Sequence, residues 1–242
     1  MAPCWWTQED LNAGAAEETQ LIWGKMTWVS GKYNVGPSLV AKFSSYSVLD
    51  SLVAHYMDRS VYPNLNAVVI AGHSAGAQMS QRYAALRSST ENDDRLHYWI
   101  GNPGSLLWLT PDRPVPNDTC NGVDVYKYGL ESGFPGYATA DANALGREGI
   151  VQKYRGRNVH YAFGLDDHGP GDTSCQAVTQ GISHLERGQN YITMLEGMEG
   201  GMPPAQTVDW IEGVSHINEA MMRSAQGIDK VSNSMALPRI QC

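Results

Sequence analysis

The pentapeptide Gly72-His73-Ser74-Ala75-Gly76 places a serine where it can become a nucleophile. A serine hydroxyl is weak at neutral pH, so it needs a base that takes its proton, an acid that orients this base, and N–H donors for the oxyanion. The two glycines permit a sharp turn from a strand into a helix, which lifts the hydroxyl above a sheet. We therefore predict Ser74 as the nucleophile, the N–H of Ala75 as an oxyanion donor, and His73 in the floor of a substrate pocket.

The base should follow the serine and the acid along the chain, each after a later strand. His216 fits this order, because it follows the strand-like stretch 207–211 through a short turn containing Gly213. Within or beside predicted helices and strands, where packed or surface histidines are expected, lie four others: His55, His97, His160 and His184. His168 is the competitor, and we predict His216 as the base.

The acid is expected after the strand-like stretch 159–163. Three aspartates follow it, and the usual spacing from the glycine at the strand end selects Asp167. Asp166 and Asp172 stay open as alternatives, because the geometry of a loop cannot be read from a sequence.

The same loop also suggests a divalent-metal site, since Asp166, Asp167, His168 and Asp172 lie close together along the chain. Metal sites usually draw ligands from several elements, and no second cluster of His, Asp or Glu stands out. We therefore expect no metal ion and no cofactor.

Helices and strands are predicted to alternate around these residues. Apolar side chains at three-and-four spacing over 45–58 predict a one-sided helix, and the apolar run 67–71 predicts a buried strand just before Ser74. Later strands are predicted at 96–100, 159–163 and 207–211, and helices at 78–86, at 174–198 and from Asn218. This order predicts one α/β domain over residues 1–242, with a mostly parallel sheet covered by helices on both faces.

Residues 105–157 interrupt the alternation. Connections in compact domains usually span about 4–6 residues, so a connection of this length is usually functional. We predict a cap over the active site. The candidates to line the pocket beneath it and bind substrate are Trp108, Phe134 and Tyr137, together with Trp5 and Trp6, and any of them can instead belong to the core. A peripheral decoration is the alternative.

The charge and composition of the chain exclude some classes of binding partner. A formal net charge of -8 argues against nucleic acid and against anionic membranes. The segment Met1–Asp10 lacks the basic start and apolar stretch of a signal peptide, and localisation is left open with the cytoplasm as default. Cys120 and Cys175 could form a disulfide, and free thiols agree equally well with the cysteine count.

Several longer motifs resemble a group of fungal and bacterial α/β-hydrolases. They are S-S-Y-S-V-L-D-S-L, D-R-S-V-Y-P-N-L and A-G-H-S-A-G-A-Q-M-S-Q-R-Y-A between Phe43 and Tyr83, then Asn102-Pro103, Y-K-Y-G-L at 126–130, and D-T-S-C-Q-A-V-T-Q-G at 172–181. The resemblance implies an α/β-hydrolase fold with a triad of Ser74, Asp167 and His216, and it supplies no substrate.

The front of the chain departs from this resemblance. In such proteins the segment similar to A-P-C-W-W-T-Q-E-D-L follows an earlier strand and an oxyanion loop, whereas here it stands at the start. The resemblance therefore implies a sheet shortened at its N-terminal side, and it leaves the second oxyanion donor unassigned. Either Met1–Trp6 lies beside the strand that precedes Ser74, or a second subunit does, as a homodimer.

These observations predict a serine hydrolase that acts on a carboxylic ester or lactone of moderate size through the Ser-His-Asp triad. Two alternatives stay open. The same triad could transfer or cyclise an acyl group in natural-product metabolism, or the fold could be retained as a non-catalytic ligand-binding protein. A complete triad argues against the last alternative, although a fold does not guarantee an activity.

Overall fold

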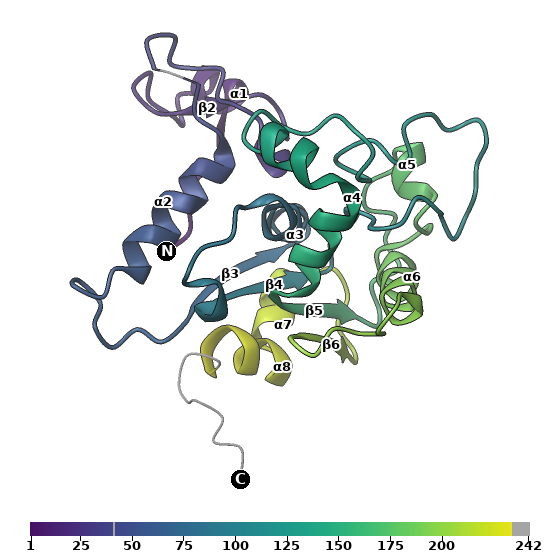
Figure 1. The fold of residues 1–242 in the computed structure, drawn as a ribbon. Coiled ribbons are helices and arrows are strands. Elements are labelled where there is room, and N and C mark those ends of the chain that lie inside the picture. Colours follow the sequence, from purple (N-terminus) through teal and green to yellow (C-terminus); the bar gives the residue numbers. More distant parts are fainter. Residues whose placement is uncertain (41, 234–242) are drawn as a thin grey trace.

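The computed structural model describes residues 1–40 and 42–233, and a parallel four-stranded sheet lies at its centre (Figure 1). The strands lie in the order β3-β4-β5-β6, and every neighbouring pair is parallel. Their bounds are β3 Val68–His73, β4 Leu96–Gly101, β5 Asn158–Gly164 and β6 Gln206–Ile211. Four predicted strands correspond to these, so the predicted α/β class with a mostly parallel sheet is confirmed.

Helices connect and follow the strands. The longer ones are α2 Ser45–Met57, α3 Ala75–Leu86, α4 Thr139–Arg155 and α6 His184–Gly197. The shorter ones are α1 Gln8–Asn12, α5 Cys175–Val178, α7 Asn218–Arg223 and α8 Ala225–Ile228, with 3-10 turns at Trp28–Ser30 and Asp93–Arg95 and a π-turn at Asp229–Asn233. None of these described helices has the length and apolar content to cross a membrane.

The predicted continuous helix over 174–198 is wrong. It is divided into α5 and α6 by a break that contains Gly181, whose φ of +147° lies outside the helical range. A side chain at Gly181 would also come within 2.9 Å of the Arg187 backbone nitrogen. Glycine is the residue that tolerates both conditions.

Different helices cover the two faces of the sheet. Successive side chains of a strand point to opposite faces. Tyr98 and Tyr161 belong to the main core cluster, which includes residues of α3, α4 and α6, whereas Trp99 and Ala162 pack with Met221 of α7. The prediction of helices on both faces is therefore confirmed.

The strand that precedes Ser74, β3, lies at an edge of the sheet. Among the described residues its backbone pairs with β4 alone. The first strand of the chain, β1 (Trp6–Thr7), pairs instead with β2 (Ile22–Trp23) in a separate two-stranded sheet. The expectation that Met1–Trp6 extends the sheet beside β3 is wrong as to pairing, because Trp6 pairs with Ile22 of β2, whereas Met1, Ala2, Pro3 and Trp5 line a groove beside β3 without forming strand pairs with it.

An apolar groove of about 650 Å³ runs along the open edge of β3. An unpaired edge exposes N–H and C=O groups that favour pairing with another strand. We predict that two copies associate through this edge, so that light scattering at micromolar concentration gives the mass of a dimer. A lysine at exposed Ala71 should shift the mass toward the monomer, whereas a lysine at exposed Ala54 on α2 should not. A stable monomer of the unmodified chain would rule out the dimer.

Residues 105–157 consist of two different parts. The stretch up to Ala138 is built mostly of turns, and α4 then packs against α3 as a connecting helix of the sheet. A cap over the site stays a prediction for residues 105–138.

A disulfide joins Cys120 to Cys175, with 5.8 Å between their Cα atoms, and it closes a loop of 55 residues. A cross-link of this span restricts the unfolded chain, which typically stabilises the fold by about 2–5 kcal/mol. Replacing both cysteines with serine should lower the free energy of unfolding in urea by that amount. Cys4→Ser, which removes an exposed free thiol, is the control. Equal stabilities of the two variants would contradict the prediction.

Candidate active site

Ser74 lies at the turn between β3 and α3. Its φ of +55° and ψ of -117° lie in a region that residues other than glycine rarely adopt, and such strain often marks a functional site. The Ser74 N–H donates to the Gly101 carbonyl at 2.9 Å, which ties the turn to β4. Ala75 is the first residue of α3, and N–H groups of a first helical turn have no partner within the helix. The turn therefore has the strand–turn–helix form that a nucleophilic serine requires.

The two glycines of the turn have different roles. A Cβ on Gly72 would come within 2.2 Å of the Gly76 carbonyl group and 2.6 Å of the Ala77 nitrogen, and all of these are backbone atoms. A Cβ on Gly76 would meet nothing within 4 Å. Strand and helix therefore approach closely at Gly72 only.

We predict that Gly72→Ala lowers the free energy of unfolding by about 1–3 kcal/mol, because the backbone around Ser74 must shift to make room. Gly76→Ala is the matched control, and it should be neutral or stabilising by up to about 1 kcal/mol since alanine favours a helix. Urea unfolding of both variants provides the measurement. Equal losses at the two positions would contradict this division of roles.

Asp167 and His216 meet beyond the ends of β5 and β6. The Nδ1 of His216 lies 2.7 Å from Oδ2 of Asp167. Asp167 is completely buried, whereas the side chain of His216 is 32% exposed. A buried carboxylate that accepts a hydrogen bond from one ring nitrogen orients the imidazole and leaves the other nitrogen available as a base.

Hydrogen bonds join the loops that carry these two residues. The Asp166 N–H donates to the Val214 carbonyl at 3.0 Å. The side-chain amide of buried Asn102 accepts from the Gly164 N–H at 2.8 Å and donates to the Ser215 carbonyl at 3.3 Å. Asn102 is thus a positioning residue for both loops. In the sequence, Asn102 stood out only as part of the Asn102-Pro103 motif of the family resemblance.

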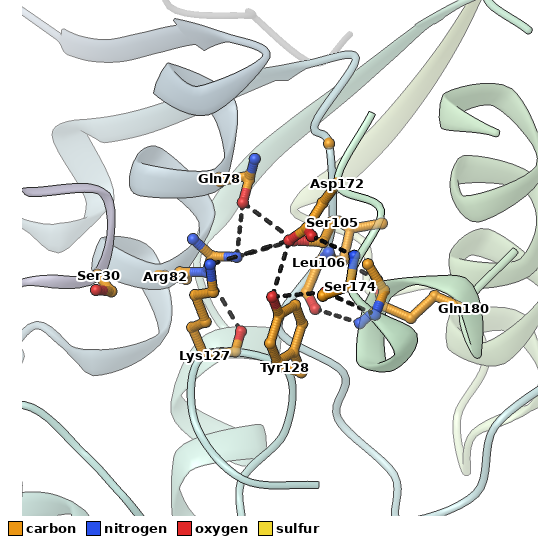
Figure 2. Close-up of polar contacts among 12 residues, drawn as sticks. Ser30, Gln78, Arg82, Ser105, Leu106, Lys127, Tyr128, Asp172, Ser174 and Gln180 are labelled. Atoms are coloured by element: carbon orange, nitrogen blue, oxygen red, sulfur yellow. Dashed lines mark hydrogen bonds and ion pairs between the residues drawn. The ribbon is translucent and has the colours of Figure 1, made fainter. Parts of the chain in front are cut away.

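The other two candidate acids have different surroundings. Asp166 is exposed. Figure 2 shows the carboxylate of Asp172 in a separate polar network, where it accepts hydrogen bonds from Ser105, Tyr128 and Ser174. Although burial opposes its ionisation, hydrogen bonds from Ser174 and Tyr128 hold the pKa of Asp172 below its usual range. Asp172 therefore anchors its loop, and Asp167 is the aspartate in contact with His216.

The sequence missed the role of His184. This residue begins α6, and its ring stacks on that of His216 with 4.0 Å between centroids. Its Nδ1 lies 3.1 Å from Oδ1 of Asp167, so two imidazoles face one carboxylate. His168, the predicted competitor, is exposed. A break in the helical pattern at Gly181 is the one signal that could have moved His184 from a helix interior to a helix start.

His73 lies on the other side of His216. The two ring centroids are 4.6 Å apart, which brings His216 next to the turn that holds Ser74. Burial, together with the neighbouring His216, lowers the pKa of His73 to about 4. His73 is therefore neutral at neutral pH, and it lines the groove beside β3. Its contact with substrate stays a prediction.

The three aromatic candidates for substrate binding within residues 105–157 pack in the core. Trp108 is buried with its ring edge-on to Tyr191, and Tyr137 is edge-on to Tyr46. Phe134 packs against the same main core cluster. None of the three lines the groove beside β3, and a role for them in binding substrate stays a prediction.

The chain matches no protein-family model and no curated protein. Among solved structures it is similar to LpqC, a poly(3-hydroxybutyrate) depolymerase from Bordetella parapertussis, with a TM-score of 0.58 and 18% identity over 85% of this chain and 63% of that chain. It is also similar to poly(aspartic acid) hydrolase-1 from Sphingomonas sp. KT-1, with a TM-score of 0.52 and 20% identity over 76% of this chain and 62% of that chain. The chain thus spans less than two thirds of the length of either structure. At these identities the likeness shows the fold, and this chain shares the α/β architecture of two hydrolases.

Proposed function

We propose that this chain is a serine hydrolase of carboxylic esters or lactones, with Ser74 as nucleophile, His216 as base and Asp167 as orienting acid. The observation that carries the proposal is the 2.7 Å contact between His216 Nδ1 and buried Asp167, next to a serine in a strained turn. Serine, histidine and aspartate in this chain order are the residue types that acyl transfer requires.

In the proposed mechanism, Asp167 accepts the Nδ1–H of His216, so that Nε2 carries a lone pair. The Ser74 hydroxyl attacks the ester carbonyl while Nε2 takes its proton, and the Ala75 N–H donates to the oxyanion. His216 then protonates the leaving alcohol as the C–O bond breaks. Water, deprotonated by the same nitrogen, attacks the acyl-enzyme, and Ser74 leaves with its proton restored.

An ester is the substrate class that we favour. The groove beside β3 reaches Gly72, His73 and Gly76. It is lined mainly by apolar residues of α2, of β3 and of the N-terminal segment, the last being Met1, Ala2, Pro3 and Trp5. The end of the groove at His73 and Gly76 suits the apolar part of an ester of moderate size, whereas the part along the backbone edge of β3 is the surface predicted to pair with a second copy. The likeness to a depolymerase of poly(3-hydroxybutyrate), a polyester, adds support for trying short hydroxyacid oligoesters beside simple esters and lactones.

Reaction with an active-site phosphonate, followed by mass mapping of the labelled peptide, tests the proposal. We expect one label per chain, on Ser74. Analysis of the products with ester substrates then distinguishes hydrolysis from acyl transfer, because the acid product appears only when water resolves the acyl-enzyme. A folded protein that is labelled elsewhere, or not at all, would exclude Ser74 as the nucleophile.

A further inference from the structure

Three side chains near the Ser74 turn form a cluster. Two of them belong to the proposed triad, and the third, His184, has no role in it. Asp167, His184 and His216 present one carboxylate and two imidazoles, whose ligand atoms all lie within 4.8 Å of one another. They come from the loop after β5, the start of α6 and the loop after β6.

Two buried polar atoms of this cluster have no hydrogen-bond partner among the described residues. They are Oδ1 of Asp167 and Nδ1 of His184, which lie 3.1 Å apart without the alignment of a hydrogen bond. Asp167 is 0% exposed and His184 is 5% exposed. A buried polar group without a partner is costly, so an arrangement of this kind calls for a ligand or a function.

We propose that Asp167, His184 and His216 form a binding site for a divalent cation of the zinc class, and that its occupation switches off the proposed hydrolase. Two imidazole nitrogens and one carboxylate oxygen make a ligand set that Zn²⁺ accepts, with water in the fourth position. His216 is partly exposed and offers an entry route.

The geometry needs only a small adjustment. Zinc bonds of about 2.0–2.2 Å with tetrahedral angles place neighbouring ligand atoms roughly 3.3 Å apart. The Nδ1 of His184 lies 3.1 Å from Oδ1 of Asp167, and the Nδ1 of His216 lies 2.7 Å from Oδ2, so each imidazole faces its own oxygen of the carboxylate. Each nitrogen therefore has to draw back from its carboxylate oxygen by a few tenths of an ångström to admit the ion between the two imidazoles and the carboxylate. The guanidinium of Arg187 lies near His184 and opposes a cation. Its Nε and Nη1 donate to the carbonyls of Gly104, Ala177 and Gly181, whereas its Nη2 has no hydrogen-bond partner among the described residues.

Inhibition follows from the tautomer of His216, and this part rests on the proposed function. A metal ion on Nδ1 displaces the proton from that nitrogen. The neutral ring then carries its proton on Nε2, which can no longer accept the proton of Ser74. Binding itself does not depend on any activity.

Calorimetric titration of the untagged protein with Zn²⁺ tests the site. A Cys4→Ser background removes an exposed thiol that could itself bind zinc. We expect one ion per chain, and no uptake of Mg²⁺, which prefers oxygen ligands. His184→Gln, and independently the smaller His184→Asn, should weaken zinc binding at least about tenfold, since each removes one ligand. His168→Gln is the matched control, because it removes an exposed histidine one residue away from Asp167.

The outcomes separate the two proposals. The metal site would be overturned if the Cys4→Ser protein, with Asp167, His184 and His216 intact, bound no zinc. It would also be overturned if the His184 and His168 variants bound zinc with equal affinity. If both His184 variants fail to fold, the absorption spectrum of Co²⁺ bound to the protein with all three ligand residues intact reports directly whether imidazoles bind the metal. Ser74→Ala should bind zinc as tightly as the parent. Zinc should slow phosphonate labelling of Ser74, and EDTA should restore it. If the phosphonate failed to label Ser74 even without zinc, the proposed hydrolase function would be contradicted. Calorimetry would still decide whether the metal site exists.

Discussion

Ser74→Ala should lower the turnover of ester substrates by about 10⁴-fold or more and abolish phosphonate labelling, while the protein stays folded. In the proposed mechanism the Ser74 hydroxyl forms the acyl-enzyme. Without it, the ester could be hydrolysed only by direct attack of water, which is much slower. Loss of the nucleophile in a serine triad typically removes most of the rate enhancement. Turnover should be measured with a chromogenic ester, and folding by thermal unfolding of the same samples.

Ser80→Ala is the matched control for this variant. Ser80 lies on the same helix α3, is buried, and donates its hydroxyl to the Gly76 carbonyl at 3.0 Å. Its loss removes one hydrogen bond to Gly76, which is usually worth about 0.5–1.5 kcal/mol, and leaves the Ser74 hydroxyl in place. Turnover should therefore stay close to that of the parent. Similar losses in both variants would show that the Ser74 effect came from a disturbed helix.

The sequence predicted the parts of the fold that depend on local pattern. Continuous apolar runs identified the central strands, since a strand buried on both faces leaves no room for polar side chains. The motif around Ser74 identified the turn because close approach at Gly72 requires glycine. The order of strands then indicated which loops would meet, and His216 does contact one of the three candidate aspartates.

The parts of the site that depend on contacts between distant residues could not be predicted from the sequence. Spacing selected Asp167 but left Asp172 open, because what separates them is their partners in space: Asp167 meets His216, and Asp172 meets Ser105 and Tyr128. His184 was missed because its meaning depends on a helix break and on the closeness of Asp167 in space. The place of Trp108 in the core also depends on long-range packing, because an aromatic residue of a long loop can line a pocket or fill the core, and its role in binding substrate stays a prediction.

Asp167→Asn should lower turnover by roughly 10⁴-fold at neutral pH with little change in substrate affinity. The carboxylate accepts the Nδ1–H of His216, and this keeps Nε2 free to take the proton of Ser74. An asparagine can direct its NH₂ group at Nδ1, which favours the opposite tautomer and leaves Nε2 protonated. The imidazole then stays in place but cannot act as a base. The kcat of the ester reaction should therefore fall, and KM should remain within a few-fold.

Two neighbouring aspartates supply the controls for this last variant. Asp166→Asn changes an exposed carboxylate one residue away and should leave kcat nearly unchanged. Asp172→Asn disturbs the network of Ser105, Tyr128 and Ser174, so it should lower the temperature of unfolding while the folded fraction keeps most of its turnover. A folded Asp172→Asn protein as inactive as Asp167→Asn would mean that the contact with His216 does not identify the acid.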